Sequence, residues 1–251
     1  MIRRVGVSRK ISGRVIVASL LTAVAVVVGV GFAYNGSLRP RDNYVSSYTP
    51  ASKTPVDSAP LVAVIGDSYT GGSAMGGYGA GNWTEIIRLR LNSANMPVRM
   101  TMSGQGGSGY VNPGSRGTVF PGEAARIVDP YDKVVVIFGS RNDTRQPVQA
   151  VRSAANATYS QIKSTAANAT LVVIGPAWTN RDVPPAITAI RDVLRSEAEA
   201  AGAVFVDPLT ESWFFGEETT LIGEDGVNPT DDGHQYLADR IEPYIRAALT
   251  A

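Results

Sequence analysis

From residue 61 onward, short runs of β-branched and apolar residues alternate with longer helix-like stretches, and this alternation restricts the possible folds. Nearly continuous apolar strands indicate a sheet that is buried on both faces, and helices between them indicate parallel crossovers. We therefore expect an α/β fold, a three-layer sandwich with a parallel sheet of about five strands. The predicted strands are 61–65, 98–102, 133–138, 171–174 and 203–206, and the predicted helices are 83–91, 148–167, 185–201 and 230–249.

The first 34 residues have the pattern of a membrane segment. Five basic residues precede an uncharged run over residues 15–34. At about 1.5 Å per residue, this run is long enough to cross the roughly 30 Å hydrocarbon core of a bilayer as one transmembrane helix. The basic flank predicts a cytoplasmic N-terminus and an extracytoplasmic C-terminal domain. A cleaved signal peptide, with a cleavage site at residues 31–33, is the alternative to the uncleaved signal-anchor that we favour, and both imply export.

Residues 35–60 are rich in Ser, Thr, Pro and Asn and show no apolar period, which is typical of a flexible tether. The predicted organisation is therefore a membrane segment over residues 1–34, a linker over residues 35–60 and a folded domain over residues 61–251.

Composition excludes several classes of protein. The chain has no Cys and a single His, which rules out disulfides, a thiol nucleophile, a Cys-ligated zinc site and a multi-histidine metal site. The formal net charge of +1 gives no indication of a nucleic-acid partner. The sequence says nothing about the oligomeric state.

Polar motifs follow three predicted strands, and the carboxyl ends of parallel strands meet at one edge of a sheet. Ser68 follows the first strand within residues 66–70 (Gly-Asp-Ser-Tyr-Thr) and could present a nucleophilic hydroxyl, although many such serines only cap a helix or turn. A glycine-rich loop over residues 103–110 follows the second strand, and its backbone N–H groups could stabilise an oxyanion. Asn142 follows the third strand and offers a side-chain amide for the same purpose.

The glycine-rich loop also fits the dinucleotide-binding pattern G-x-G-x-x-G. That pattern requires a helix that opens at the glycines. Residues 110–114 (Tyr-Val-Asn-Pro-Gly) cannot open a helix, so we reject this interpretation.

The last motif, over residues 225–234, contains the only His. A Ser hydroxyl needs an adjacent base near neutral pH, and an imidazole suits that role. We therefore predict that His234 is the proton acceptor. Asp231, three residues before it, is the preferred carboxylate to orient the ring, and Asp225 is the alternate. The competing hypothesis is that His234 only packs at the start of the last helix.

Taken in this order, the motifs resemble the SGNH/GDSL hydrolase family over roughly residues 61–251. Ser68 matches the nucleophile of the family, Gly106 matches its backbone oxyanion donor and Asn142 matches its side-chain donor. The N–H of Ser68 is expected to join this oxyanion hole. The resemblance implies a flavodoxin-like α/β/α fold, ester or acyl-transfer chemistry, no metal and no cofactor. Four neighbouring residues are expected to contact the substrate: Tyr69, Gly107, Tyr110 and Asn228.

The sequence departs from the family where the base should be. Family members usually read Asp-x-x-His-Pro, whereas this chain has Asp225 followed by Asn228-Pro229. Three hypotheses follow: an active esterase that uses His234, a catalytically impaired enzyme, or an envelope module that binds acylated or glycan ligands. We favour an exported serine esterase, or acyltransferase, that acts on an ester of the cell envelope or on a small ester.

Overall fold

The computed structural model describes residues 58–216 and 220–251. The predicted transmembrane helix, and the predicted tether up to residue 57, lie outside these ranges. Within them, no helix combines the length and the apolar character that a membrane span requires.

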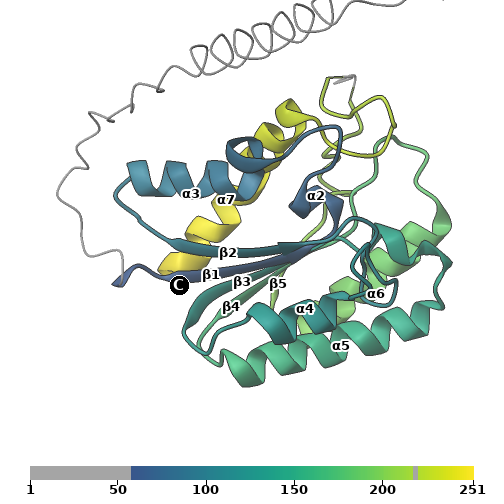
Figure 1. The fold of residues 1–251 in the computed structure, drawn as a ribbon. Coiled ribbons are helices and arrows are strands. Elements are labelled where there is room, and N and C mark those ends of the chain that lie inside the picture. Colours follow the sequence, from purple (N-terminus) through teal and green to yellow (C-terminus); the bar gives the residue numbers. More distant parts are fainter. Residues whose placement is uncertain (1–57, 217–219) are drawn as a thin grey trace, which may run out of the picture. The chain divides into compact units, whose positions relative to one another are not determined.

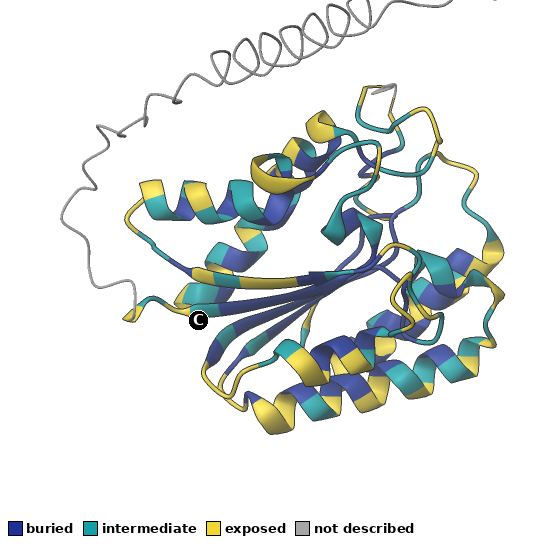
Figure 2. Ribbon diagram, in the orientation of Figure 1, coloured by how far each residue is buried: buried dark blue, intermediate teal, exposed yellow. Residues whose placement is uncertain are grey.

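A five-stranded parallel sheet forms the centre of the domain, in the order β2-β1-β3-β4-β5. This order is the flavodoxin-like one. The inner strands are buried along nearly their whole length, whereas the edge strand β2 is largely exposed (Figure 2). The strands are β1 (Leu61–Gly66), β2 (Arg99–Gly104), β3 (Asp132–Phe138), β4 (Thr170–Ile174) and β5 (Val204–Val206).

Helices cover both faces of the sheet, as the sequence predicts (Figure 1). One face packs against α3 (Trp83–Ser93) and α7 (Asp231–Thr250), and the other packs against α4 (Phe120–Ile127), α5 (Val148–Thr165) and α6 (Pro185–Ala200). The three-layer α/β/α sandwich is therefore confirmed. Three short helical segments complete the fold: α2 (Ser68–Gly71), η2 (Gly79–Gly81) and η3 (Arg141–Arg145).

Helix α4 is not among the helices predicted from the sequence, where Pro121 and Gly122 interrupt its helical pattern. Pro121 lies in the first turn of the helix, where a missing backbone N–H costs nothing. Phe120 and Ala124, one turn apart, bury the inner side of the helix against the sheet.

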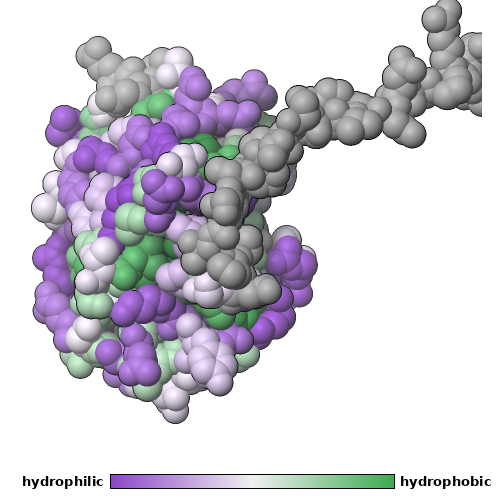
Figure 3. All heavy atoms as spheres, turned by 90° about the vertical axis from the view of Figure 1, so that its left-hand side faces the viewer, coloured by the Kyte–Doolittle hydropathy of each residue, from purple (hydrophilic) through white to green (hydrophobic). Residues whose placement is uncertain are grey.

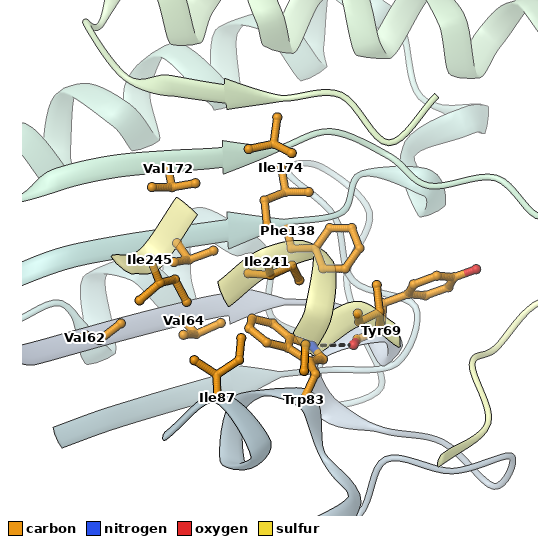
Figure 4. Packing of buried hydrophobic residues seen from close by; sticks show 14 of the residues in the cluster. Val62, Val64, Tyr69, Trp83, Ile87, Phe138, Val172, Ile174, Ile241 and Ile245 are labelled. Atoms are coloured by element: carbon orange, nitrogen blue, oxygen red, sulfur yellow. Dashed lines mark hydrogen bonds between the residues drawn. The ribbon is translucent and has the colours of Figure 1, made fainter. Parts of the chain in front are cut away.

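Two hydrophobic clusters hold the layers together, one on each face of the sheet. Figure 4 shows the cluster beneath α3 and α7, in which Trp83 packs beside Val64 and Ile87. The indole Nε1 of Trp83 also donates to the carbonyl oxygen of Tyr69 at 2.8 Å. The core thereby fixes the turn that follows β1.

The carboxyl ends of the strands and the loops that follow them lie at one edge of the sheet, beside α2 (Figure 1). Figure 3 views the domain from the opposite side, where hydrophilic side chains surround smaller hydrophobic areas. The motifs of the sequence therefore meet at the first of these two edges.

Candidate active site

Ser68 lies at the start of α2, directly after β1. The carboxylate of Asp67 accepts a hydrogen bond from Tyr69 N at 2.9 Å and so fixes this turn. The end of β2 approaches closely, since a Cβ atom on Gly104 would lie 2.3 Å from Gly71 N. Small residues at both positions therefore allow the turn that carries Ser68 to sit against the glycine-rich loop.

Ser68 lines a polar cavity of about 540 Å³. Its walls come from four segments that are far apart in the sequence, and they bring Gly106, Asn142 and Asn228 together with Ser68. The lining residues are Ser68, Gly71, Gly72, Ser73, Tyr78, Gly104, Gly106, Gly107, Ser115, Arg116, Asn142, Val227 and Asn228.

Three groups in this cavity could stabilise an oxyanion. Among the described residues, no hydrogen bond uses the backbone N–H of Ser68 or of Gly106, so both remain available as donors. The Nδ2 of Asn142 donates to the carboxylate of Asp67 at 3.1 Å and to the carbonyl oxygen of Ser108 at 2.9 Å. Asn142 must therefore exchange one of these bonds in order to donate to a reaction intermediate.

Asp67 is the partner that could release Asn142. Burial raises the pKa of its carboxyl to about 7, although the hydrogen bond from Tyr69 N and the positive charge of Arg141 oppose the shift. A protonated carboxyl accepts hydrogen bonds less strongly than a carboxylate. The Asn142 amide is therefore held less tightly when Asp67 is neutral.

Asp143, which the sequence analysis did not identify, joins the two loops that carry the oxyanion donors. Its buried carboxylate accepts hydrogen bonds from the backbone N–H of Tyr110, Val111 and Asn112 at 2.7–3.0 Å. It also accepts one from Ser140 Oγ at 2.7 Å. This carboxylate thus fixes the glycine-rich loop to the segment that contains Asn142, and its position beside Asn142 in the sequence was the available signal.

Asn228 and Asp225 form a pair at the rim of the cavity. The Nδ2 of Asn228 donates to Asp225 Oδ2 at 2.6 Å, and Asp225 Oδ1 accepts from the backbone N–H of Val227 and Asn228. Burial acts against ionisation, but these bonds and the charge of Arg141 hold the pKa of Asp225 below its usual range. The Oδ1 of Asn228 is buried and has no hydrogen-bond partner among the described residues. A carboxylate is therefore placed to orient the side chain at position 228.

His234 does not occupy the position predicted for the base. Its side chain is fully buried, it is absent from the cavity that Ser68 lines, and its ring packs against Gly77. The Nδ1 atom faces the backbone N–H of Trp83 at 3.4 Å, and Nε2 has no partner among the described residues. The sequence did contain the signal, since four of the buried positions of α7 follow helical spacing: His234, Leu237, Ala238 and Ile241.

Asp231 likewise does not occupy the position that the predicted role requires. Its Oδ1 accepts a hydrogen bond from Gly77 N at 2.8 Å, and its side chain does not line the cavity. Burial lowers the pKa of His234 to about 4, although the charge of Asp231 opposes this shift. The two residues lie in the first turn of α7, and neither of them lines the cavity that contains Ser68.

The four predicted substrate contacts divide into two groups. Gly107 and Asn228 line the cavity. Tyr69 and Tyr110 instead lie in the hydrophobic clusters, where the hydroxyl of Tyr69 donates to the carbonyl oxygen of Val227 and that of Tyr110 bonds with Tyr159. The tyrosines are buried because each packs its ring edge-on against a neighbouring phenylalanine.

The burial of a neutral His234 predicts a pH-dependent stability. The pKa of a histidine is near 6.5 in the unfolded chain, whereas the pKa of His234 in the folded protein is about 4. Between these values protons bind preferentially to the unfolded state. The contribution of His234 to the stability of the fold is therefore complete above pH 6.5 and is lost as the pH falls toward 4. This histidine should then contribute a loss of about 3 kcal/mol in the free energy of unfolding by pH 4. Urea denaturation between pH 7 and pH 4 should show a smaller loss for His234→Gln than for the parent. Equal losses in the two proteins would mean that His234 is accessible to protons in the folded state.

Comparisons with known proteins agree with this architecture. Residues 64–236 match the model of the GDSL-like lipase/acylhydrolase family. The GDSL lipase Rv0518 of Mycobacterium tuberculosis is 44% identical over 191 residues, which cover 75% of this chain and 82% of that protein.

Solved structures share the fold at low sequence identity. The structure of TesA has a TM-score of 0.61 at 15% identity, covering 75% of this chain and 99% of that one. The psychrotrophic esterase EstA from Pseudoalteromonas sp. has a TM-score of 0.58 at 16% identity, covering 76% and 99% respectively. A family two carbohydrate esterase from Clostridium thermocellum has a TM-score of 0.61 at 17% identity, covering 80% and 67%. On the family match and the identity to the mycobacterial lipase, the chain belongs to the GDSL-like lipase/acylhydrolase family of SGNH hydrolases.

Proposed function

We propose that the domain is a serine esterase whose turnover is slow because Asn228 stands in the position of the base. The observation that carries this proposal is the cavity in which Ser68, Gly106 and Asn142 meet the Asn228–Asp225 pair. A nucleophile and its oxyanion donors are present, whereas an imidazole is absent from the residues that line the cavity. The substrates are carboxylic esters or other acyl donors.

The chemistry follows from the positions of these groups. The Ser68 oxygen attacks the carbonyl carbon of the ester, and the negative charge that develops is stabilised by the N–H groups of Ser68 and Gly106 and by the Asn142 amide. The alkoxide leaves and takes a proton from solvent, and water then hydrolyses the acyl-serine to release the carboxylic acid and restore the Ser68 hydroxyl. Because an amide cannot accept the hydroxyl proton near neutral pH, this proton passes to solvent. Serine hydrolases that lack a triad member retain about 10³–10⁴-fold acceleration over water, so esters with good leaving groups are the expected substrates.

The alternative is a binding module for acylated or glycan ligands, which the Asn at position 228 favours. A pure binder has no chemical need for a serine beside two free N–H groups and a side-chain amide. Reactivity of Ser68 toward an acylating or phosphonylating reagent therefore separates the two functions.

We expect a fluorophosphonate probe to label the purified full-length chain slowly. Labelling should disappear in Ser68→Ala and persist in Ser153→Ala, whose serine is exposed on α5. The measurement is in-gel fluorescence followed by mass spectrometry of the labelled peptide. A chain that stays unlabelled, or that is labelled equally in Ser68→Ala, would support the binding module instead.

We also propose that the domain acts outside the cytoplasmic membrane on an ester of the cell envelope or on a small ester. The support is the basic flank and the apolar run within residues 1–34. A membrane-impermeant form of the same probe should then label Ser68 in intact cells. Labelling that appears only after lysis would contradict export.

A further inference from the structure

A second cavity, of about 330 Å³, adjoins the one that Ser68 lines. Gly107 and Asn142 belong to the walls of both cavities. The remaining lining residues come from the segment just after the glycine-rich loop, from η3 and from the segment after β4. They are Asn112, Arg141, Thr144, Arg145 and Trp178. Two of these side chains are cationic, and none of the described lining residues is acidic.

Arg141 and Trp178 pack against one another in the wall of this cavity. The guanidinium carbon of Arg141 lies 4.0 Å from the centroid of the Trp178 ring, so the two planar groups hold one another in place. Arg141 Nη1 and Trp178 Nε1 are both buried, and neither has a hydrogen-bond partner among the described residues. Buried N–H donors normally have a partner, and leaving one unpaired is costly. Two unpaired donors, both on side chains that line one cavity, therefore indicate a site for an acceptor.

The charge of Arg141 acts on the carboxyls of Asp67 and Asp225, but no described acidic side chain pairs with it directly. Neither Arg141 nor Arg145 takes part in a salt bridge within the described residues, whereas the similarly shielded Arg191 pairs with Asp207 at 2.9 Å. A guanidinium presents a planar fork of N–H groups that matches the oxygens of a carboxylate or a phosphate. An oxygen-bearing anion is therefore the acceptor that fits both the charge and the donors.

We propose that this second cavity is an anion subsite, which binds a carboxylate or phosphate group carried by the ester substrate. Arg141 and Trp178 Nε1 donate hydrogen bonds to the anion, and Arg145 adds positive charge at the rim. Because Gly107 and Asn142 line both cavities, an anion in the second cavity lies beside the carbonyl group that Ser68 attacks. The identification of the ester rests on the proposed function, but binding of the anionic group does not require a reactive Ser68.

The test compares two esters of similar length, monoethyl glutarate, which is anionic, and ethyl pentanoate, which is neutral. Each is titrated calorimetrically at low salt into the full-length Ser68→Ala chain, so that no turnover interferes. We expect the anionic ester to bind roughly 10- to 100-fold more tightly, the range for hydrogen bonds to a charged group. In the same background, Arg141→Gln should remove this preference. Arg99→Gln is the matched control, because it removes one exposed positive charge at the amino end of β2 and should retain the preference.

Arg145→Gln provides a second variant, since this exposed side chain is not required for packing. It should reduce the preference several-fold. Equal affinities for the two esters, or a preference that survives both Arg141→Gln and Arg145→Gln, would overturn the proposal. Inorganic phosphate and acetate are then tested as competitors. Stronger displacement by one of them identifies the anion as a phosphate or a carboxylate, and displacement by neither counts against the site.

The outcomes for the subsite and for the esterase are distinguishable. If Ser68 resists the fluorophosphonate probe while the preference for the anionic ester persists, the esterase proposal fails and the anion subsite stands. If the probe labels Ser68 and the preference is absent, the esterase proposal stands and the anion subsite fails.

Discussion

Asn228→His should raise kcat/KM for a short-chain aryl ester by about 10²–10⁴, the usual contribution of a positioned general base. Asn228 lines the same cavity as Ser68, and its Nδ2 lies 2.6 Å from Asp225 Oδ2. An imidazole at this position could donate its Nδ1–H to Asp225 and accept the hydroxyl proton of Ser68 at Nε2. The gain is measured by steady-state kinetics of the parent and the variant at pH 7 to 8.

Two further variants test the cause of this gain. Asp225→Asn, introduced together with Asn228→His, should remove most of it, because the imidazole then loses the carboxylate that sets its tautomer and orientation. His234→Gln should leave the gain intact, since His234 is buried away from the cavity. A variant Asn228→His that is no faster than the parent would show that Ser68 and position 228 do not act together. A large loss of parent activity in His234→Gln, with the fold intact, would restore His234 as the base.

Asn142→Ala should lower kcat by about 10²–10³ in the enzyme activated by Asn228→His, which is the usual cost of removing one oxyanion donor. The Asn142 amide reaches the reaction intermediate only after it gives up its bond to Asp67 or to Ser108. The effect should therefore fall mainly on kcat, with little change in KM, because the charge that it stabilises exists only in the transition state.

The folding of this variant has to be checked separately, since Asn142 also joins the loop after β3 to Asp67. Thermal unfolding should change little between the parent and Asn142→Ala. Asn180→Ala, at an exposed asparagine in the loop after β4, is the matched control and should keep full activity. A kcat that is unchanged in Asn142→Ala would remove Asn142 from the oxyanion hole and leave the two backbone N–H groups as its donors.

The order of the motifs along the chain determined much of the site. Ser68 and Asn142 each follow a strand that is buried on both faces, and Gly106 follows β2. In a parallel sheet the carboxyl ends of all strands lie at one edge, so residues at these ends meet whatever the details of packing. The alternation of apolar runs and helices likewise predicted the three layers, because only a small set of layer architectures buries the apolar sides of such elements.

The tertiary structure alone decided which of two nearby residues lines the same cavity as Ser68. In the sequence His234 and Asn228 are six residues apart in the same motif, and chemistry favoured the imidazole. The start of α7 at Asp231 places His234 on the inward side of the helix, beneath Gly77 and Trp83, while Asn228 stays in the loop that borders the cavity. The pairing of Arg141 with Trp178 was also invisible in the sequence, because these residues follow different strands and meet only when β3 and β4 lie side by side. Local patterns fix which elements form, whereas the direction of a single side chain depends on contacts between distant segments.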